Sequence, residues 1–254
     1  MMYDLERQNE IYEILKQKKS ISVNRLTKLL YVSQSTIRRD LTEMEKQGLV
    51  KRTYGGVVLQ ESPNEETSLL LRETINVKAK KKIAEIASRL LKDNLSIFID
   101  SSSTCTYLVP YLKNFKNLNI VTNGLRIGLL LSEQTSCQIF LASGYIHSRS
   151  NSILGNLTVK TLERIHCDYS IISCSGLDLN FGITETTIDQ SEVKNAMAEN
   201  SNKIILLADH SKFDNATLFK SIPLNKINYI VTDEKPREEY EQFCKENGIS
   251  LLYE

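Results

Sequence analysis

The sequence predicts two domains of different class: a small helical unit with a β-hairpin, then a larger α/β domain with a mostly parallel sheet. Three observations predict this division. Amphipathic helical segments fill the first 47 residues, a Gly-Gly dipeptide follows between two short apolar runs, and short apolar runs then alternate with helix-length segments up to residue 232. At 254 residues the chain exceeds one small domain. We expect the first domain at 1–59, a linker at 60–76 and the α/β domain at 77–254.

The first domain is predicted to contain three helices. Apolar residues recur at helical spacing over 4–18, and a second helix follows Ser22, whose hydroxyl suits an N-cap. After a short turn, Ser33 caps a third helix over 34–47, and Gly48 ends it. Beyond this helix, 49–59 is typical of a hairpin that turns at Gly55 and Gly56. Three helices and a hairpin make a winged helix-turn-helix.

A helix that enters the DNA major groove needs polar side chains in its first turn and cations nearby for phosphate. The third helix and the hairpin supply both, so we expect duplex DNA as a partner at Ser33, Gln34, Ser35, Thr36, Arg38, Arg39, Lys51, Arg52, Tyr54, Gly55 and Gly56. Residues 1–60 hold eleven Lys and Arg against seven Asp and Glu, whereas the whole chain holds 32 against 31. Base contacts and phosphate contacts are not separable at this stage, and two adjacent arginines on a helix also fit a solvated face.

The second domain is predicted to open with a helix over 77–91 whose lysines, Lys78, Lys80, Lys81 and Lys82, form a solvated face. Apolar runs typical of strands follow at 96–100, 119–122, 137–142, 169–173, 203–208 and 229–232. Helix-length segments lie between them at 107–114, 124–132, 158–164 and 192–200. This alternation predicts a parallel sheet covered on both faces.

Polar loops follow several of these strands, where open α/β sheets bind ligands. Asp100, Ser101, Ser102, Ser103 and Thr104 follow one strand, and Thr122 and Asn123 follow the next. Hydroxyl and N–H donors before a helix favour a phosphate, although an ordinary N-cap has the same composition. Further candidates lie after later apolar runs or in the next helix: Gly144, Asp178, Glu192, Lys194 and Lys212.

The segment Val32-Ser33-Gln34-Ser35-Thr36-Ile37-Arg38-Arg39-Asp40-Leu41, with Gln47-Gly48-Leu49-Val50-Lys51-Arg52 and Tyr54-Gly55-Gly56 after it, resembles the N-terminal signature of the DeoR family of bacterial sugar-metabolism repressors. The later polar segments resemble the family's C-terminal sensor in order and spacing. The resemblance implies that the helix after Ser33 reads DNA and that Asp40 holds a neighbouring basic side chain. It also implies a sensor similar in fold to ribose-5-phosphate isomerase and glucosamine-6-phosphate deaminase.

In that family a phosphorylated sugar releases the repressor from its operator, so the resemblance implies such an effector here. It places the phosphate at 101–104 with Asp100 at the base of the loop, Thr122 and Asn123 beside it, and Asp178, Glu192, Lys194 and Lys212 toward the sugar. Many relatives have glycine where this chain has Ser102, which bears on how closely a phosphate approaches the backbone.

Two alternatives stay open. The chain could be a sugar-phosphate isomerase or deaminase with an added DNA-binding module, using Asp100, Asp178 or Glu192 as a general base. It could also bind DNA without responding to a metabolite. We expect a non-catalytic regulator, and a homodimer or homotetramer, because helix-turn-helix proteins read paired half-sites.

Composition restricts the remaining classes. The five cysteines form no CxxC pair and have no histidine at zinc-ligand spacing, which favours reduced thiols. We expect no metal site and no cofactor. The apolar runs fall far short of the roughly 20 residues that span a bilayer, and no leader precedes the first helix, so we expect a cytoplasmic protein without a membrane partner.

Overall fold

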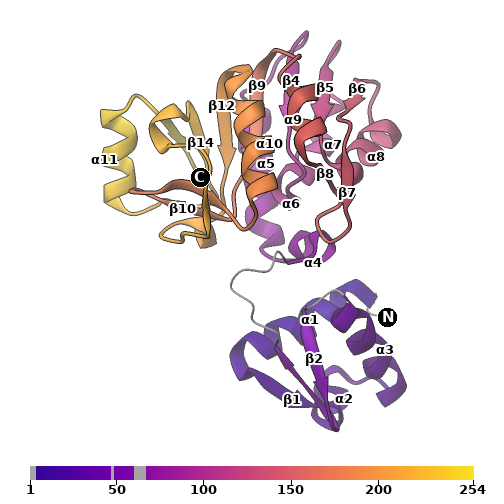
Figure 1. Cartoon of the computed structure of the whole chain (residues 1–254). Coiled ribbons are helices and arrows are strands. Elements are labelled where there is room, and N and C mark those ends of the chain that lie inside the picture. Colours follow the sequence, from indigo (N-terminus) through magenta and orange to yellow (C-terminus); the bar gives the residue numbers. More distant parts are fainter. Residues whose placement is uncertain (1–3, 47–48, 60–66) are drawn as a thin grey trace. The chain divides into compact units, whose positions relative to one another are not determined.

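The structure is a computed structural model that describes residues 4–46, 49–59 and 67–254. The chain divides into two compact units, Met1–Ile75 and Asn76–Glu254 (Figure 1). We describe each unit separately. None of the helices in the described part is both long and apolar enough to cross a membrane.

The first unit has the predicted three helices and a hairpin, with one further strand and one further helix. Its elements are α1 (Asp4–Lys18), β1 (Ser20–Ser22), α2 (Val23–Leu30), α3 (Gln34–Lys46), β2 (Val50–Thr53), β3 (Gly56–Leu59) and α4 (Leu69–Thr74). The three strands form an antiparallel sheet in the order β1-β3-β2. Gln47 and Gly48, predicted to end the third helix, lie outside the described residues.

The predicted N-caps are confirmed. The Ser22 hydroxyl accepts a hydrogen bond from the backbone N–H of Arg25 at 3.3 Å, and the Ser33 hydroxyl accepts one from the N–H of Thr36 at 3.2 Å. Between the two helices, Tyr31 adopts the left-handed conformation with φ 54°. This single residue ends α2 and turns the chain into α3.

Asp40 holds a basic side chain, as the sequence suggested. Its two carboxylate oxygens accept hydrogen bonds from Nε of Arg7 at 2.5 Å and from its second terminal nitrogen at 2.9 Å. Both side chains are buried. This bidentate pair fixes α3 against α1, because a buried guanidinium and carboxylate satisfy each other only in this geometry.

The linker predicted at 60–76 is wrong over its described part. Leu69 to Thr74 form α4, which packs against α1, and Leu71 belongs to the buried core of the first unit. The first unit therefore extends to Ile75, and the second begins at Asn76. Burial of Leu69 and Leu71 stabilises this short helix, although the sequence just before it is polar.

The second unit is built on one parallel sheet of seven strands in the order β15-β14-β12-β9-β4-β5-β6 (Figure 1). The strands are β4 (Ser96–Ile99), β5 (Asn119–Thr122), β6 (Gln138–Leu141), β9 (Cys167–Ser173), β12 (Ser201–Leu207), β14 (Tyr229–Val231) and β15 (Ser250–Leu252). The first six were predicted with similar bounds. β15 was not predicted.

Helices cover both faces of this sheet. They are α5 (Val77–Ser88), α6 (Ser103–Thr106), α7 (Val109–Leu112), α8 (Leu125–Gln134), α9 (Asn156–Leu162), α10 (Ile188–Glu199) and α11 (Glu238–Glu246). Successive strand residues enter opposite cores: Ile97 and Ile99 pack with α5 to α8, and Phe98 packs with α9 to α11. The result is a three-layer α/β/α arrangement.

Several short antiparallel strands were not predicted. β7 (Tyr145–His147) pairs with β8 (Ser152–Leu154), and β11 (Gly182–Glu185) pairs with both β10 (Gly176–Asp178) and β13 (Phe219–Lys220). Two short 3-10 turns, also not predicted, lie at His210–Lys212 and Leu224–Lys226. These segments follow carboxyl ends of the parallel strands, so they contribute side chains to that edge of the sheet.

The lysine run was wrong at one position. Lys80 is only 4% exposed, whereas Lys78 and Lys81 lie on more accessible positions of α5. The five cysteines are free thiols, as expected.

Candidate functional site

The first half of α3 exposes most of the predicted DNA-reading side chains. Gln34, Ser35, Arg38 and Arg39 are exposed and Thr36 is half-buried, whereas Ile37 is fully buried. The buried residue anchors the helix, which leaves the polar residues on its outer side. Asn24 of α2, which the sequence did not single out, accepts a hydrogen bond from the Gln34 side-chain amide at 2.6 Å. This contact orients Gln34 before any partner binds.

The hydroxyls at the start of α3 form a local cluster. Ser33 Oγ lies 2.8 Å from Ser35 Oγ and 2.9 Å from Thr36 Oγ1, in addition to capping the helix. The Ser33 hydroxyl therefore already has a structural role, and a contact to a DNA base would compete with these hydrogen bonds.

The hairpin carries the predicted wing residues. Tyr54 and Gly55 form its exposed tip, and Gly55 has a φ of 76°, which glycine adopts without strain. A Cβ on Gly56 would lie 2.9 Å from the carbonyl oxygen of Ile21, so the close approach of β1 requires glycine there. Arg52 turns back to α3, where it donates to Thr42 Oγ1 at 2.6 Å and pairs with Glu45. Arg52 therefore braces the wing against α3.

A groove of about 380 Å³ runs beside the wing tip and includes two basic residues that sequence reasoning missed, Lys18 and Arg25. Both side chains are exposed. They belong to α1 and α2, and only the fold brings them beside Tyr54 and Gly55. The groove extends the positive charge of this surface beyond α3.

In the second unit, the polar loops after β4 and β5 meet. Asp100 to Thr104 are all buried, although they are five consecutive polar residues. The N–H of Ser101 donates to Asn123 Oδ1 at 3.1 Å, and Thr122 Oγ1 accepts from the N–H of Gly124 at 3.0 Å. The two loops lie beside each other because β4 and β5 are adjacent and parallel, so their carboxyl ends lie at the same edge of the sheet.

Lys194 lies between two carboxylates at this edge, one of which is Asp100 at the start of the first loop. Its Nζ is 2.5 Å from Glu185 Oε1, 3.2 Å from Asp100 Oδ2 and 2.7 Å from the carbonyl oxygen of Ser173. All three charged side chains are buried. Burial alone would lower the pKa of Lys194, but the charges of Glu185 and Asp100 outweigh it and raise that pKa.

This cluster, hereafter the Lys194 cluster, changes two sequence interpretations. The three protons of the ammonium group already have three acceptors, so Lys194 holds the carboxylates and does not offer a free charge to a ligand. Glu185 was missed because it lies in the short strand β11, which has no clear sequence pattern. Its second oxygen accepts a hydrogen bond from Ser175 Oγ at 2.9 Å, so both oxygens are engaged.

Glu192 does not join the cluster. It is exposed on α10, two residues before Lys194, and a helix turns about 200° over two residues. The expectation that Glu192 faces the same site as Lys194 is therefore wrong. The sequence placed the start of this helix at 192, but α10 begins at Ile188, so Lys194 lies in its middle.

The remaining predicted residues occupy separate positions around the edge. Asp178 caps the β10–β11 turn, where Oδ1 accepts from the N–H groups of Asn180 at 2.8 Å and Phe181 at 3.1 Å. Gly144 permits close packing, since a Cβ there would lie 2.2 Å from Thr158 Oγ1. Lys212 is half-buried near Asp209.

Two residues from other elements are hydrogen-bonded in a chain that reaches the loop after β4. Ser152 Oγ of β8 lies 2.6 Å from Ser101 Oγ and accepts from the side-chain amide of Gln190 at 3.1 Å. Both Ser152 and Gln190 are buried. Sequence reasoning missed them because β8 is three residues long and Gln190 precedes the predicted start of its helix.

A second polar cluster follows β12 at the same edge. Asp209 Oδ1 accepts hydrogen bonds from Asn76 Nδ2 at 3.1 Å and from the N–H of Ser211 at 3.0 Å. Burial would raise the pKa of Asp209, but Lys212, the Ser211 hydroxyl and Lys80 lower it. Asp209 is therefore charged at neutral pH and holds Asn76, the first residue of the second unit.

One group of side chains has metal-ligand chemistry. His210, Asp233 and Glu234 each bring one ligand atom within 4.8 Å of the others. His210 Nδ1 is already hydrogen-bonded to Asp233 Oδ2 at 2.7 Å, and that bond raises the pKa of His210. The ring nitrogen facing the carboxylate is thus used in an ordinary ion pair.

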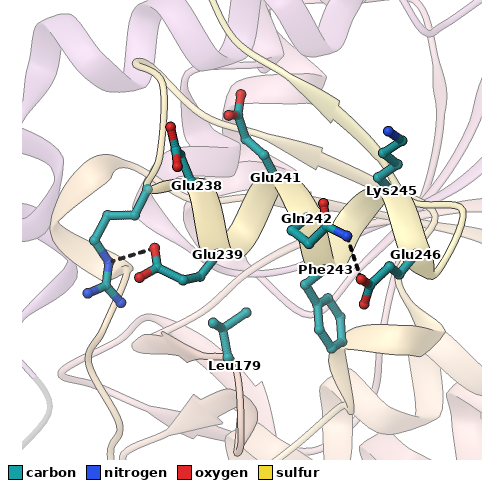
Figure 2. A pocket seen from close by; sticks show the side chains of 9 residues that line it. Leu179, Glu238, Glu239, Glu241, Gln242, Phe243, Lys245 and Glu246 are labelled. Carbon is teal, nitrogen blue, oxygen red and sulfur yellow. Dashed lines mark hydrogen bonds and ion pairs between the residues drawn. The ribbon is translucent and has the colours of Figure 1, made fainter.

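A separate groove lies along α11 (Figure 2). Its volume is about 980 Å³, and four glutamates, Glu238, Glu239, Glu241 and Glu246, line it with Arg237 and Lys245. None of its lining residues belongs to the polar loops after β4 and β5 or to the Lys194 cluster. Acidic side chains repel a phosphate, so this groove does not suit an anionic ligand.

An N-terminal winged helix-turn-helix followed by a parallel-sheet α/β domain is an arrangement found in transcriptional regulators. Two family models match this chain: a DeoR-like helix-turn-helix domain over residues 7–63 and a DeoR C-terminal sensor domain over residues 75–234. The chain belongs to the DeoR family of transcriptional regulators.

Named relatives match along almost their whole length. The HTH-type transcriptional regulator GolR of Listeria innocua is 33% identical over 92% of each chain. The glycerol-3-phosphate regulon repressor of Escherichia coli is 30% identical over 98% of this chain and 99% of its own. A ribose 5-phosphate isomerase A structure from Methanocaldococcus jannaschii covers 53% of both chains at 15% identity with a TM-score of 0.39, which is too distant to bear on activity.

Replacing Lys194 by Met should destabilise the second unit by about 3–5 kcal/mol, because two buried carboxylates lose their shared cation. Urea unfolding of the whole chain, followed by circular dichroism, measures the change. Lys160→Met, at an exposed helix position of the same unit, is the matched control and should shift stability by less than about 0.5 kcal/mol. Equal midpoints for the two variants would show that the amine does not hold the carboxylates.

Proposed function

We propose that this chain represses a sugar-metabolism operon by binding operator DNA through α3 and the wing, and that a phosphorylated sugar controls its affinity for that DNA. The observation that carries the effector half is the burial of Asp100 to Thr104 beside Asn123. Five buried polar residues are costly in a core, and a crevice that receives a polar ligand gives them a use.

The polar groups of the crevice suit the two ends of a sugar phosphate. Hydroxyls of Ser101, Ser103 and Thr104 offer donors to phosphate oxygens. The Lys194 cluster carries one net negative charge, and carboxylate oxygens accept hydrogen bonds from sugar hydroxyls. We place the phosphate toward 101–104 and the sugar toward Asp100 and Glu185. Glu185 thus takes the place that the sequence analysis gave to Glu192.

The enzyme alternative has less support. A general base needs a carboxylate oxygen that can take up a proton, but both oxygens of Glu185 already accept hydrogen bonds, from Lys194 and from Ser175. The lone pairs that remain can still accept a hydrogen bond from a sugar hydroxyl. Asp100 likewise accepts from the N–H groups of Ser102 at 3.1 Å and Ser173 at 3.2 Å. The relatives named above are transcriptional regulators. We therefore assign the crevice to sensing.

Arg38→Ala should weaken operator binding by about 1–3 kcal/mol if the side chain reads a base, roughly 5- to 150-fold in dissociation constant. Electrophoretic mobility shift with DNA from upstream of the chain's own gene measures this. Arg164→Ala, an exposed arginine of the second unit, is the control and should bind like the wild type. Unchanged binding by Arg38→Ala, or an equal loss in the control, would refute the assignment of α3.

A panel of sugar phosphates, titrated into the same assay, tests the effector. One member should change DNA affinity and raise the melting temperature of the protein, because ligand that binds only the folded state stabilises it. Ser103→Ala should weaken that ligand about 10-fold or more through loss of a hydrogen bond to a charged group. Ser132→Ala on exposed α8 should not. If no sugar phosphate has an effect, the chain binds DNA without this control.

We further propose that the ligand signal leaves the second unit through Asn76. Ile75 packs on the core of the first unit, and Asn76, the next residue, is bonded to Asp209 at the carboxyl edge. Asn76 has a φ of 51° and its side chain does not cap α5. A ligand that attracts Lys212 or Lys80 alters the charge balance around Asp209, and Asn76 is the residue next affected.

Asn76→Gly tests this route, since glycine keeps the left-handed backbone and removes only the side-chain bonds. The variant should bind DNA and effector with near wild-type affinity but show a smaller effect of one on the other. Asn94→Gly is a matched control, because Asn94 is also left-handed, at φ 62°, and its side chain bonds to Asn117. Full coupling in Asn76→Gly would exclude the route.

A further inference from the structure

The two edges of the seven-stranded sheet differ in how they are protected. At one edge, β15 is followed by Tyr253 and Glu254. Glu254 pairs with Arg89 and also accepts a hydrogen bond from Lys82, and Tyr253 donates to Glu241 at 2.7 Å. Charged groups beside an edge strand are a usual protection against pairing with another chain.

The other edge, β6, lacks this protection (Figure 1). Phe140 and Leu141 are 46% and 47% exposed. Successive strand residues point to opposite faces, so each face of β6 has an apolar side chain that is about half exposed at this end. β6 pairs with β5 on its inner side, and the second unit, which is described throughout, places no strand on its outer side.

Exposed apolar side chains continue around this edge. We define the β6 patch as Leu129, Phe140, Leu141, Tyr145, Ile146 and Leu157, each between 46% and 60% exposed. Two close approaches link elements that carry these side chains. A Cβ on Gly128, next to Leu129, would lie 3.3 Å from Leu141 Cδ1, and one on Gly155 would lie 2.9 Å from the Tyr145 ring. Exposed apolar side chains gathered on the elements around one sheet edge mark an interaction site.

The composition of the patch selects its occupant. The ten residues from Cys137 to Ile146 include no Lys, Arg, Asp or Glu. Nucleic acid or a charged peptide would find no opposite charge there, whereas a second copy of the same surface meets no like charge. A two-fold axis also brings an edge strand antiparallel to its own copy, so both outer backbones gain hydrogen bonds.

We propose that two copies of this chain associate through the β6 patch, with β6 paired to β6 across a two-fold axis. The sheet then continues through the dimer as fourteen strands, twice the seven of one copy. This inference rests on the surface alone and does not depend on the proposed effector or operator. If α3 reads DNA, the dimer supplies two such helices for two half-sites.

The backbone register provides a further test of strand pairing, in which an outer N–H is lost together with one patch side chain. The N–H groups of Gln138 and Ala142 donate to Leu118 and Thr122 on the β5 side. Because N–H direction alternates along a strand, the N–H of Leu141 points outward. Leu141→Pro therefore removes an outer donor without removing a bond to β5, and edge strands tolerate proline.

Sedimentation velocity of the full chain, without DNA or ligand, at micromolar concentration measures the association. The wild type should be a dimer or a multiple of one. Phe140→Lys should raise the dimer dissociation constant about 30-fold or more, as loss of a central apolar contact does. Leu141→Pro should do the same, and Leu218→Lys, 63% exposed but outside the patch, should not. Circular dichroism melts check that each variant is folded.

The outcomes separate the parts of the proposal. A monomeric wild type, or a dimer that survives Phe140→Lys, overturns the assigned surface. A dimer lost in Phe140→Lys but kept in Leu141→Pro overturns the strand pairing. Should a single variant fail to fold, Leu129→Lys, on α8 at the same patch, provides the same readout, and an intact dimer there counts against the proposal.

Discussion

The second unit depends on the ion cluster in which Lys194 lies between Asp100 and Glu185. It joins three elements at one place: the carboxyl end of β4, the hairpin strand β11 and the middle of α10. Two buried carboxylates without a cation would cost several kcal/mol, so the position of Lys194 fixes where these elements meet. The loop that begins at Asp100 is held in position by that constraint.

Because of this constraint, Lys194 positions other side chains and does not itself bind a ligand. Lys194 has no proton left for a ligand, so its charge acts through the two carboxylates that it orients. Groups with capacity to bind a ligand are then the hydroxyls of 101–104 and the remaining lone pairs of the carboxylates. This combination of groups is consistent with the phosphorylated sugar that we propose as effector, which has both acceptor and donor groups.

The first unit applies the same logic on a smaller scale. Arg7 and Asp40 fix α3 against α1, and Arg52 braces the wing against Thr42 and Glu45. Arg38 and Gln34 remain on the exposed side of a helix that is held at several points. A rigid frame lowers the entropy lost when such side chains contact DNA.

The sequence by itself determined the helix caps, the wing turn, most of the parallel strands and the polar loops after β4 and β5, because each is encoded within about ten neighbouring residues. Only the tertiary structure decided that Glu185 and not Glu192 pairs with Lys194, that Lys80 is buried, and that α4 belongs to the first unit. Those outcomes depend on contacts between residues distant in sequence, where burial and charge pairing override local pattern.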